Sequence, residues 1–221
     1  MKKIIAAVIG VLLFAGLPVL VWRLAGHGAF AAQPARAAYL VVATLLQIAV
    51  AVFVPGQGFS RTEGQTVVAR QRVAVIFLQL LTIGVVVISP WTDSGATASM
   101  LSQPLRYAGL TLFAGGTLLM NWAVVWLGRH FSVQVTLQEN HRLVTKGPYK
   151  WIRHPRYTGI TCCFLGIALV FASVIGFVLW VLLFATLLWR IHDEETLMAA
   201  AFPAEWPEYS RKTAKLIPYL V

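Results

Sequence analysis

Residues 158–189 read TGITCCFLGIALVFASVIGFVLWVLLFATLLW and contain no charged side chain. A transmembrane helix needs roughly 20 mainly apolar residues, so this run is too long for one ordinary span. Ser173 and Gly176 lie near its middle, and small residues of these types are common in turns. We therefore expect a tight helical hairpin, two membrane helices joined by a turn near Ser173 to Gly176.

The same apolar character extends over the whole chain. Of its 221 residues, 58% are hydrophobic and only 12% are charged, and the mean hydropathy is +0.74. A water-soluble fold of this size could not bury so much apolar surface. The expected fold is therefore an all-α integral membrane protein with about six transmembrane helices. They cover residues 4–22, 37–54, 73–90, 105–127, 158–173 and 175–190.

The first of these segments has one competing interpretation. Lys2 and Lys3 followed by an apolar run are also typical of a signal peptide. The run from Ile4 to Leu20 is long for such a peptide, and no small-x-small cleavage site follows it directly. We therefore expect a retained first span.

Positive charge is distributed unevenly around the six expected spans. With a cytoplasmic N-terminus, fifteen of the 18 Lys and Arg residues fall on the cytoplasmic side, and only Arg23, Arg36 and Arg106 fall outside. This is the bias expected from the positive-inside rule, and it predicts that both termini are cytoplasmic. The net charge of +10 is thus interpreted as topology and contact with anionic membrane lipids, with no nucleic acid as partner. No feature of the sequence specifies an oligomeric state.

Polar residues gather in the C-terminal part of the chain. Residues 1–130 hold the first four expected helices, and residues 131–221 hold a polar loop, the hairpin and a cytoplasmic tail, which together form one integrated domain. Arg190 and Glu194 are four residues apart, so they share a face where the sixth helix leaves the membrane. Such a pair is either a solvated ion pair of little energetic value or part of a ligand path.

His154 stands directly before Pro155, at the expected start of the fifth span. A single interfacial histidine is more often structural than a ligand. Pro155 favours an extended backbone at His154, and a bent helix start of this kind suits an anionic or zwitterionic small molecule. The five histidines lack metal-ligand spacing, so no metal site is expected. The sequence also contains no Walker loop, GxGxxG motif or GxSxG elbow.

Residues 141–159, HRLVTKGPYKWIRHPRYTG, resemble the signature of the isoprenylcysteine carboxyl methyltransferase and phospholipid methyltransferase family. A second part of the resemblance is Arg190-x-x-x-Glu194-Glu195, followed by aromatic residues and by Leu216-Ile-Pro218. The two motifs occur in the family's order, separated by the hairpin, and the resemblance covers about residues 134–218. Trp206, where the family often has Tyr, and Pro203-Ala204, where it often has a Gly-containing turn, depart from the pattern.

The resemblance implies an integral membrane methyltransferase whose site faces the cytoplasm. S-adenosylmethionine would occupy a pocket roofed by the C-terminal segment, and a lipophilic or lipidated acceptor would enter from the bilayer. The resemblance assigns catalytic roles to Arg190 and Glu194, with Arg190 facing the substrate and Glu194 the donor's charged amine. The implied cofactor contacts are Gln134, His141, Leu143, Val144, Tyr149, His154, Pro155, Tyr157 and Glu194.

The acceptor is left open by the sequence. An isoprenylcysteine-type carboxyl group is the leading expectation, with phospholipid N-methylation and small-thiol S-methylation as alternatives. A second enzyme class is an NADPH-dependent sterol-type reductase, because such reductases share a similar helical core with a His-Pro-x-Tyr-x-Gly-like element. A third class is a non-catalytic membrane scaffold, against which the intact Arg190 and Glu194 argue.

Overall fold

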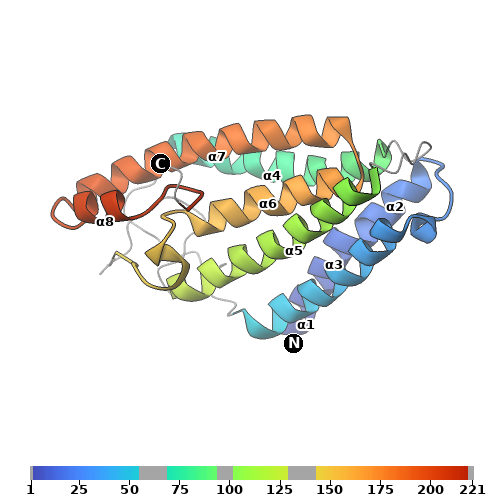
Figure 1. Ribbon diagram of the computed structural model, residues 1–221, viewed down its shortest axis with the longest axis horizontal. Coiled ribbons are helices and arrows are strands. Elements are labelled where there is room, and N and C mark those ends of the chain that lie inside the picture. Colours follow the sequence, from blue (N-terminus) through green and yellow to red (C-terminus); the bar gives the residue numbers. More distant parts are fainter. Residues whose placement is uncertain (1, 55–68, 94–101, 129–142, 219–221) are drawn as a thin grey trace.

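The computed structural model describes residues 2–54, 69–93, 102–128 and 143–218, and these residues form a helical bundle (Figure 1). In the described residues the elements are α1 (Lys2–Val11), η1 (Leu12–Gly16), α2 (Leu17–Leu24), η2 (Phe30–Ala32), α3 (Pro34–Phe53), α4 (Ala69–Trp91), α5 (Ser102–Leu127), η5 (Gly147–Lys150), α6 (Pro155–Val170), α7 (Val174–Ala201) and α8 (Trp206–Lys212). The all-α membrane fold expected from the sequence is confirmed.

Five helical segments in the described part are long and apolar enough to cross a membrane, where six spans were expected. The remaining expected span corresponds to α6, which is apolar but has only 16 residues. At 1.5 Å per residue it measures about 24 Å, less than the roughly 30 Å of a hydrocarbon core. The helix also lies three residues earlier than the expected span of residues 158–173, since it begins at Pro155 and ends at Val170.

The first span is one helical rod with a local change of winding. α1 continues into the π-helix η1 and then into α2, so that residues Lys3–Leu24 form a single candidate span. Pro18 lies in the first turn of α2. Proline has no N–H to donate, and a π-helical turn just before it accommodates the interrupted hydrogen-bond ladder.

The hairpin is present, but its turn comes earlier than the sequence suggested. The turn comprises Phe171 to Ser173, and Ala172 adopts a left-handed backbone with φ +44°. Ser173 is the N-cap of α7, since its hydroxyl accepts from the N–H of Gly176 at 2.8 Å. This cap, typical of serine, makes Ser173 the start of the second helix instead of a turn centre. α7 then continues past the expected bilayer boundary to Ala201.

α5 and α6 pack closely because each presents two glycines to the other. A Cβ on Gly116 would lie 2.4 Å from the Cys163 nitrogen and 2.6 Å from the Gly159 oxygen, and the contact is reciprocal. About two helical turns away on the same helices, a Cβ on Gly109 would lie 2.8 Å from the Gly166 oxygen. Glycines spaced seven apart lie on one face of a helix, so the two backbones meet at two levels.

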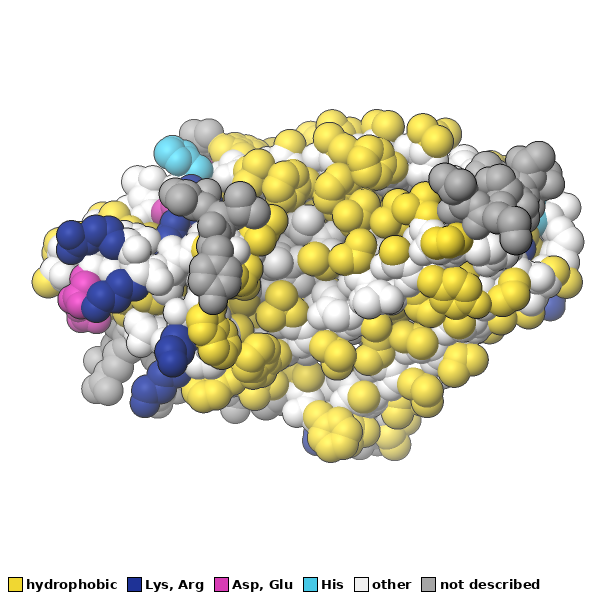
Figure 2. Space-filling view, in the orientation of Figure 1, with side chains coloured by type: hydrophobic (Ala, Val, Ile, Leu, Met, Phe, Trp, Pro, Cys, Tyr) yellow, Lys and Arg dark blue, Asp and Glu magenta, His cyan; other side chains and the backbone are white. Residues whose placement is uncertain are grey.

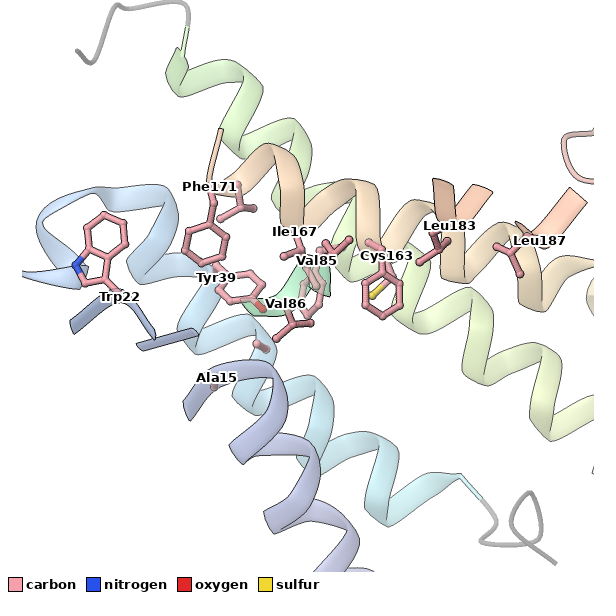
Figure 3. Close-up of a cluster of buried hydrophobic side chains, with 14 of the residues drawn as sticks. Ala15, Trp22, Tyr39, Val85, Val86, Cys163, Ile167, Phe171, Leu183 and Leu187 are labelled. Atoms are coloured by element: carbon pink, nitrogen blue, oxygen red, sulfur yellow. The ribbon is translucent and has the colours of Figure 1, made fainter. Parts of the chain in front are cut away.

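Buried aromatic and aliphatic side chains join the N-terminal helices to the hairpin (Figure 3). The Tyr39 ring of α3 lies 4.9 Å from Phe113 of α5 and 5.5 Å from Phe171, centroid to centroid. Its hydroxyl donates to the backbone oxygen of Phe14 at 2.7 Å. Ile167 and Leu183, from the two arms of the hairpin, are fully buried in the same cluster. The bundle therefore has one continuous core.

A buried ion cluster lies at the end of the bundle where α4 ends. The Asp93 carboxylate accepts from Arg36 at 2.9 Å and from Arg106 at 2.7 and 3.0 Å. Arg106 also donates to the Val170 oxygen at 2.6 Å, and the Arg36 guanidinium lies 4.0 Å from the centre of the Trp22 ring. The cluster thereby ties five chain segments together. The single negative charge of Asp93 offsets one of the two positive charges of Arg36 and Arg106, both of which are exceptions to the charge distribution.

Large apolar side chains cover the outside of the helices. Ile4, Leu45 and Val174, for example, are 69%, 62% and 75% exposed. Figure 2 shows hydrophobic side chains along the length of the bundle on this face, with Lys and Arg gathered at the end that carries α8. An exposed apolar belt of this kind identifies the lipid-facing surface of an integral membrane protein.

Candidate functional site

The site begins where the chain turns from η5 into α6. Gly147 has a φ of +62°, and a Cβ there would lie 2.4 Å from a ring carbon of Trp126 on α5. Only glycine meets both conditions, because other residues disfavour positive φ and would collide with the indole. This close approach lays η5 against α5 and buries Tyr149 at the inner surface of the loop.

The C-terminal segment docks onto the chain that precedes α6. Ile152 and Ala214 form a parallel β-bridge, with hydrogen bonds from Ala214 N to the Trp151 oxygen at 3.0 Å and from Arg153 N to the Ala214 oxygen at 2.8 Å. Thr158 adds a side-chain bond to the Leu216 oxygen at 2.7 Å. The main chain after α8 is therefore fixed beside the first turn of α6.

Tyr209 of α8 joins the same contact. Its hydroxyl donates to the Tyr149 oxygen at 2.9 Å, and burial raises the pKa of Tyr209 to about 12. The phenol is consequently protonated, and able to donate, at neutral pH. Burial also raises the pKa of Tyr149, and the nearby Glu194 carboxylate raises it further. Tyr149 therefore lies within electrostatic reach of Glu194.

Glu195 is the charged centre of this docking. One carboxylate oxygen accepts from Arg153 Nε at 2.8 Å and lies 3.2 Å from His154 Nε2. The other lies 3.1 Å from Lys215 Nζ. Arg153 extends the network, since its guanidinium also donates to the backbone oxygens of Ser210 and Thr213. Charge-assisted bonds of this kind are about twice as strong as neutral ones, so Glu195 holds the C-terminal segment in place.

A hydrogen-bonded chain of three side chains lies next to the Glu195 network, since Glu194 directly precedes Glu195 in α7. Arg190 Nε donates to the Tyr157 hydroxyl at 2.7 Å, and that hydroxyl donates to Glu194 Oε2 at 2.7 Å. Arg190 and Tyr157 are buried, with 3% and 6% of their surface exposed, whereas Glu194 is half-buried. The arrangement places a cation, a phenol and a carboxylate in sequence across the interface of α6 and α7.

The structure brings most of the sequence-predicted residues to this end of the molecule. His154 is buried as the N-cap of α6, Pro155 is the first residue of that helix, and the His154 and Tyr157 rings stack with centroids 5.6 Å apart. Leu143 and Val144 are half-buried in the segment before η5. Gln134 and His141 lie outside the described residues.

Two residues in this region were not assigned roles by the sequence. Glu195 is the carboxylate that contacts Arg153, His154 and Lys215, although the resemblance assigned the functional carboxylate to its neighbour. Arg156 lies within electrostatic reach of Arg190, Glu194 and Tyr149, which makes a second arginine part of the same cluster. The adjacent acidic pair was a visible signal for Glu195. Arg156 lies between Pro155 and Tyr157, and nothing in the sequence distinguished it from the other basic residues of that segment.

Comparisons with known proteins fit this geometry. Residues 105–205 match the phospholipid methyltransferase family model. The chain is 29% identical over 119 residues to protein-S-isoprenylcysteine O-methyltransferase B of Arabidopsis thaliana, covering 51% of this chain and 58% of that protein. It is 32% identical over 112 residues to protein-S-isoprenylcysteine O-methyltransferase of Schizosaccharomyces pombe, covering 48% of this chain and 46% of the relative. The chain thus spans about half of the length of these relatives.

A solved structure extends the likeness to the fold. The eukaryotic intramembrane Ras methyltransferase ICMT, an isoprenylcysteine carboxyl methyltransferase, aligns over 95% of this chain and 74% of its own length, with a TM-score of 0.55 and 20% sequence identity. At that identity the likeness concerns the fold. The matched residues include α6, α7 and the Arg190–Tyr157–Glu194 chain, so the chain is similar to the isoprenylcysteine carboxyl methyltransferases and the phospholipid methyltransferase family over about half of its length.

Proposed function

We propose that this protein is an integral membrane methyltransferase that uses S-adenosylmethionine to methylate a lipophilic acceptor, most like the carboxyl group of an isoprenylcysteine. The observation that carries the proposal is the chain from Arg190 through Tyr157 to Glu194. It offers a cation and an anion separated by one phenol, at the end of the bundle where the family's motifs meet. The match to the phospholipid methyltransferase family model and the names of the relatives support the reaction class.

Glu194 is the carboxylate suited to the donor's ammonium group. Its neighbour Glu195 is already engaged by Arg153, His154 and Lys215, whereas within the described residues Glu194 accepts only from a neutral phenol. A half-buried carboxylate that accepts one hydrogen bond has acceptor positions left for a ligand. S-adenosylmethionine supplies an electrophilic methyl group when bound. The Glu194 carboxylate therefore fits the ammonium group of this cofactor.

Other residues of the implied set would complete the cofactor site. Tyr149, His154 and Pro155 lie beside Glu194 or at the start of α6, and Leu143 and Val144 offer apolar surface from the segment before η5. Gln134 and His141 belong to the same proposal through the family resemblance. The docked C-terminal segment would serve as the roof, excluding water from a displacement that depends on alignment more than on acid or base groups.

Arg190 is proposed to orient the acceptor. Its guanidinium is buried and held at Nε by Tyr157, which fixes the plane of the group. A guanidinium held in this way recognises a carboxylate by a planar fork, a geometry that an amine or thiol acceptor would not use. The second candidate acceptor is a phospholipid amine, favoured by the description of the family model that matches residues 105–205.

The function is tested by separate titrations of the purified protein with S-adenosylhomocysteine and with NADPH. Saturable binding of the first alone supports the proposal, and binding of NADPH alone supports the reductase instead. Methyl transfer is then measured with an S-prenylated cysteine, an aminophospholipid and an alkyl thiol. Transfer to the prenylated cysteine identifies the proposed acceptor, while transfer to the lipid amine alone replaces it with the second candidate. Binding of S-adenosylhomocysteine without transfer to any of these acceptors supports the non-catalytic membrane scaffold instead.

We further propose that both termini and the candidate site face the cytoplasm, as the charge distribution predicts. Lys146 is exposed beside the site and Arg23 is exposed at the far end of the first span. A cysteine replacing Lys146 should react with an impermeant thiol reagent only after cell lysis, and one replacing Arg23 should react in intact cells. Both are made in a Cys162→Ser, Cys163→Ala background. The reverse pattern of labelling would invert the topology.

A further inference from the structure

A cationic cavity lies against the docked C-terminal segment, and its described lining includes none of Tyr157, Arg190 and Glu194. It has a volume of about 470 Å³ and lies between the segment that precedes α6 and the end of the chain after α8. Five of its lining residues carry positive charge, and none of the described lining residues is acidic. The cations are Lys150, Arg153, Arg211, Lys212 and Lys215.

Two carboxylates pair with some of these cations but leave a positive excess. Glu208 lies 2.5 Å from Lys212, and Glu195 engages Arg153 and Lys215. Five positive charges against two negative ones leave three positive charges around the cavity. Within the described part of the chain, Lys150 and Arg211 form no ion pair, and the Arg211 guanidinium bonds only through Nε to the Pro207 oxygen. The cavity therefore suits an anion that several donors can contact together.

The aromatic residues beside the cavity indicate its depth relative to the bilayer. Trp151 lines the cavity and is 51% exposed, and its ring lies 6.4 Å from Trp122 on α5, which is 45% exposed. Trp126, one turn along α5, is 44% exposed. Exposed tryptophans at the end of a membrane helix are typical of the interface between hydrocarbon and water. The cavity consequently opens at the level of the lipid headgroups.

We propose that this cavity is a binding site for the phosphate of an anionic membrane lipid. Basic pockets at this depth on the cytoplasmic side attract anionic headgroups, with about 1 kcal/mol, or roughly fivefold in affinity, per Lys or Arg near the surface. A lipid phosphate there would contact Lys150 before α6 and Arg211 and Lys215 from the C-terminal part. Bound lipid thereby links the two walls and stabilises the docked C-terminal segment.

The test uses the full-length protein in lipid nanodiscs. Retention of phosphatidylglycerol in a phosphatidylcholine background is measured by native mass spectrometry for the wild type, for Lys150→Gln/Arg211→Gln and for Lys146→Gln. Lys146 is an exposed cation of the same loop that does not line the cavity, so it is the matched control. We expect the double variant to bind about 25-fold more weakly, at roughly fivefold per cation, and the control to match the wild type. Equal retention by all three proteins would overturn the site.

A second arm separates a lipid from a soluble anion and does not depend on any variant. Hydrogen exchange of residues 210–218 is measured in phosphatidylcholine alone, with phosphatidylglycerol, and with inorganic phosphate. Slower exchange with phosphatidylglycerol, weakened by added salt, supports the lipid site. The same protection by inorganic phosphate at equal concentration would mean that the occupant is a soluble phosphate, and protection by neither would contradict the proposal. None of these readouts requires methyl transfer, so the outcome is independent of the proposed enzyme activity.

Discussion

The Nε–H of Arg190 donates to the Tyr157 hydroxyl oxygen at 2.7 Å, across the interface between the two arms of the hairpin. The same hydroxyl then donates to Glu194. One phenol therefore positions both charged groups to which the family resemblance assigns function. The two residues are therefore joined through one side chain, and the resemblance assigns one of them to the acceptor and the other to the donor.

Tyr157→Phe should disturb both charged groups while preserving the ring in the helix interface. Loss of the hydroxyl removes a bond from buried Arg190 and from Glu194, at a cost of about 1 to 3 kcal/mol in the free energy of unfolding. Cofactor affinity and turnover should fall together. Both are measured alongside thermal unfolding in detergent. Tyr107→Phe is the control, since Tyr107 is 44% exposed on α5. Equal, small effects in the two variants would rule out a positioning role for the Tyr157 hydroxyl.

Glu195→Gln should release the C-terminal segment from the start of α6. The carboxylate is only 19% exposed and is shared by Arg153, His154 and Lys215, so neutralising it removes charge-assisted bonds worth about 1.5 to 3 kcal/mol. Hydrogen exchange of residues 206–216 should therefore accelerate while that of the helix cores stays unchanged. The measurement is native-state exchange followed by mass spectrometry.

Glu208→Gln provides the matched control for the Glu195 variant. Glu208 also pairs with a lysine, at 2.5 Å, but both side chains are at least 65% exposed. Surface pairs of this kind contribute little to stability. Exchange of residues 206–216 should therefore remain at the wild-type rate. A similar acceleration in both variants would mean that general charge, and not the buried network, holds the segment.

The contact between α5 and α6 predicts opposite effects for two adjacent glycines. Gly116→Ala places a methyl group 2.4 Å from a backbone nitrogen, so the helices must separate, at a cost of about 1 to 3 kcal/mol. A Cβ on Gly115 meets nothing within 4 Å, so Gly115→Ala should be neutral or stabilise the helix by up to about 1 kcal/mol. Thermal unfolding of the two variants compares them directly. A close contact of no energetic importance would give the same midpoint for both.

Hydropathy and charge were sufficient to predict the membrane fold and the hairpin, because these features depend on the composition of local segments. Specific long-range partners were not predictable. Asp93 pairs with Arg36 and Arg106 from two other segments, although both arginines stood out only as exceptions to the charge distribution. Likewise, the seven-residue glycine spacing in α5 and α6 is visible in the sequence, but nothing there states that the two glycine pairs meet.

The candidate site shows the same division between motif and geometry. The family motifs singled out segments that the fold brings together, since His154, Tyr157, Arg190 and Glu194 lie at one end of the bundle. They did not distinguish the tasks of the two adjacent glutamates. Neighbouring residues on a helix point about 100° apart, so Glu194 faces Tyr157 while Glu195 faces the docked segment. That difference appears only when the surrounding elements are in place.

The final prediction separates the roles of Glu194 and Arg190 by measuring cofactor affinity and turnover for each variant. If Glu194 binds the charged amine of the donor, Glu194→Gln should weaken S-adenosylhomocysteine binding by about 1 to 3 kcal/mol, the usual loss for a charge-assisted hydrogen bond. If Arg190 orients an acceptor carboxylate, Arg190→Lys should leave that affinity nearly intact while turnover collapses, because an ammonium cannot reproduce the planar fork. Since Tyr157 bridges the two residues, a purely structural role would instead reduce affinity, turnover and thermal stability in parallel for both variants. The decisive comparison is therefore the ratio of turnover loss to affinity loss. A ratio near one in both variants would contradict separate roles for Glu194 and Arg190. A large ratio for Arg190→Lys alone identifies Arg190 as the residue that orients the acceptor.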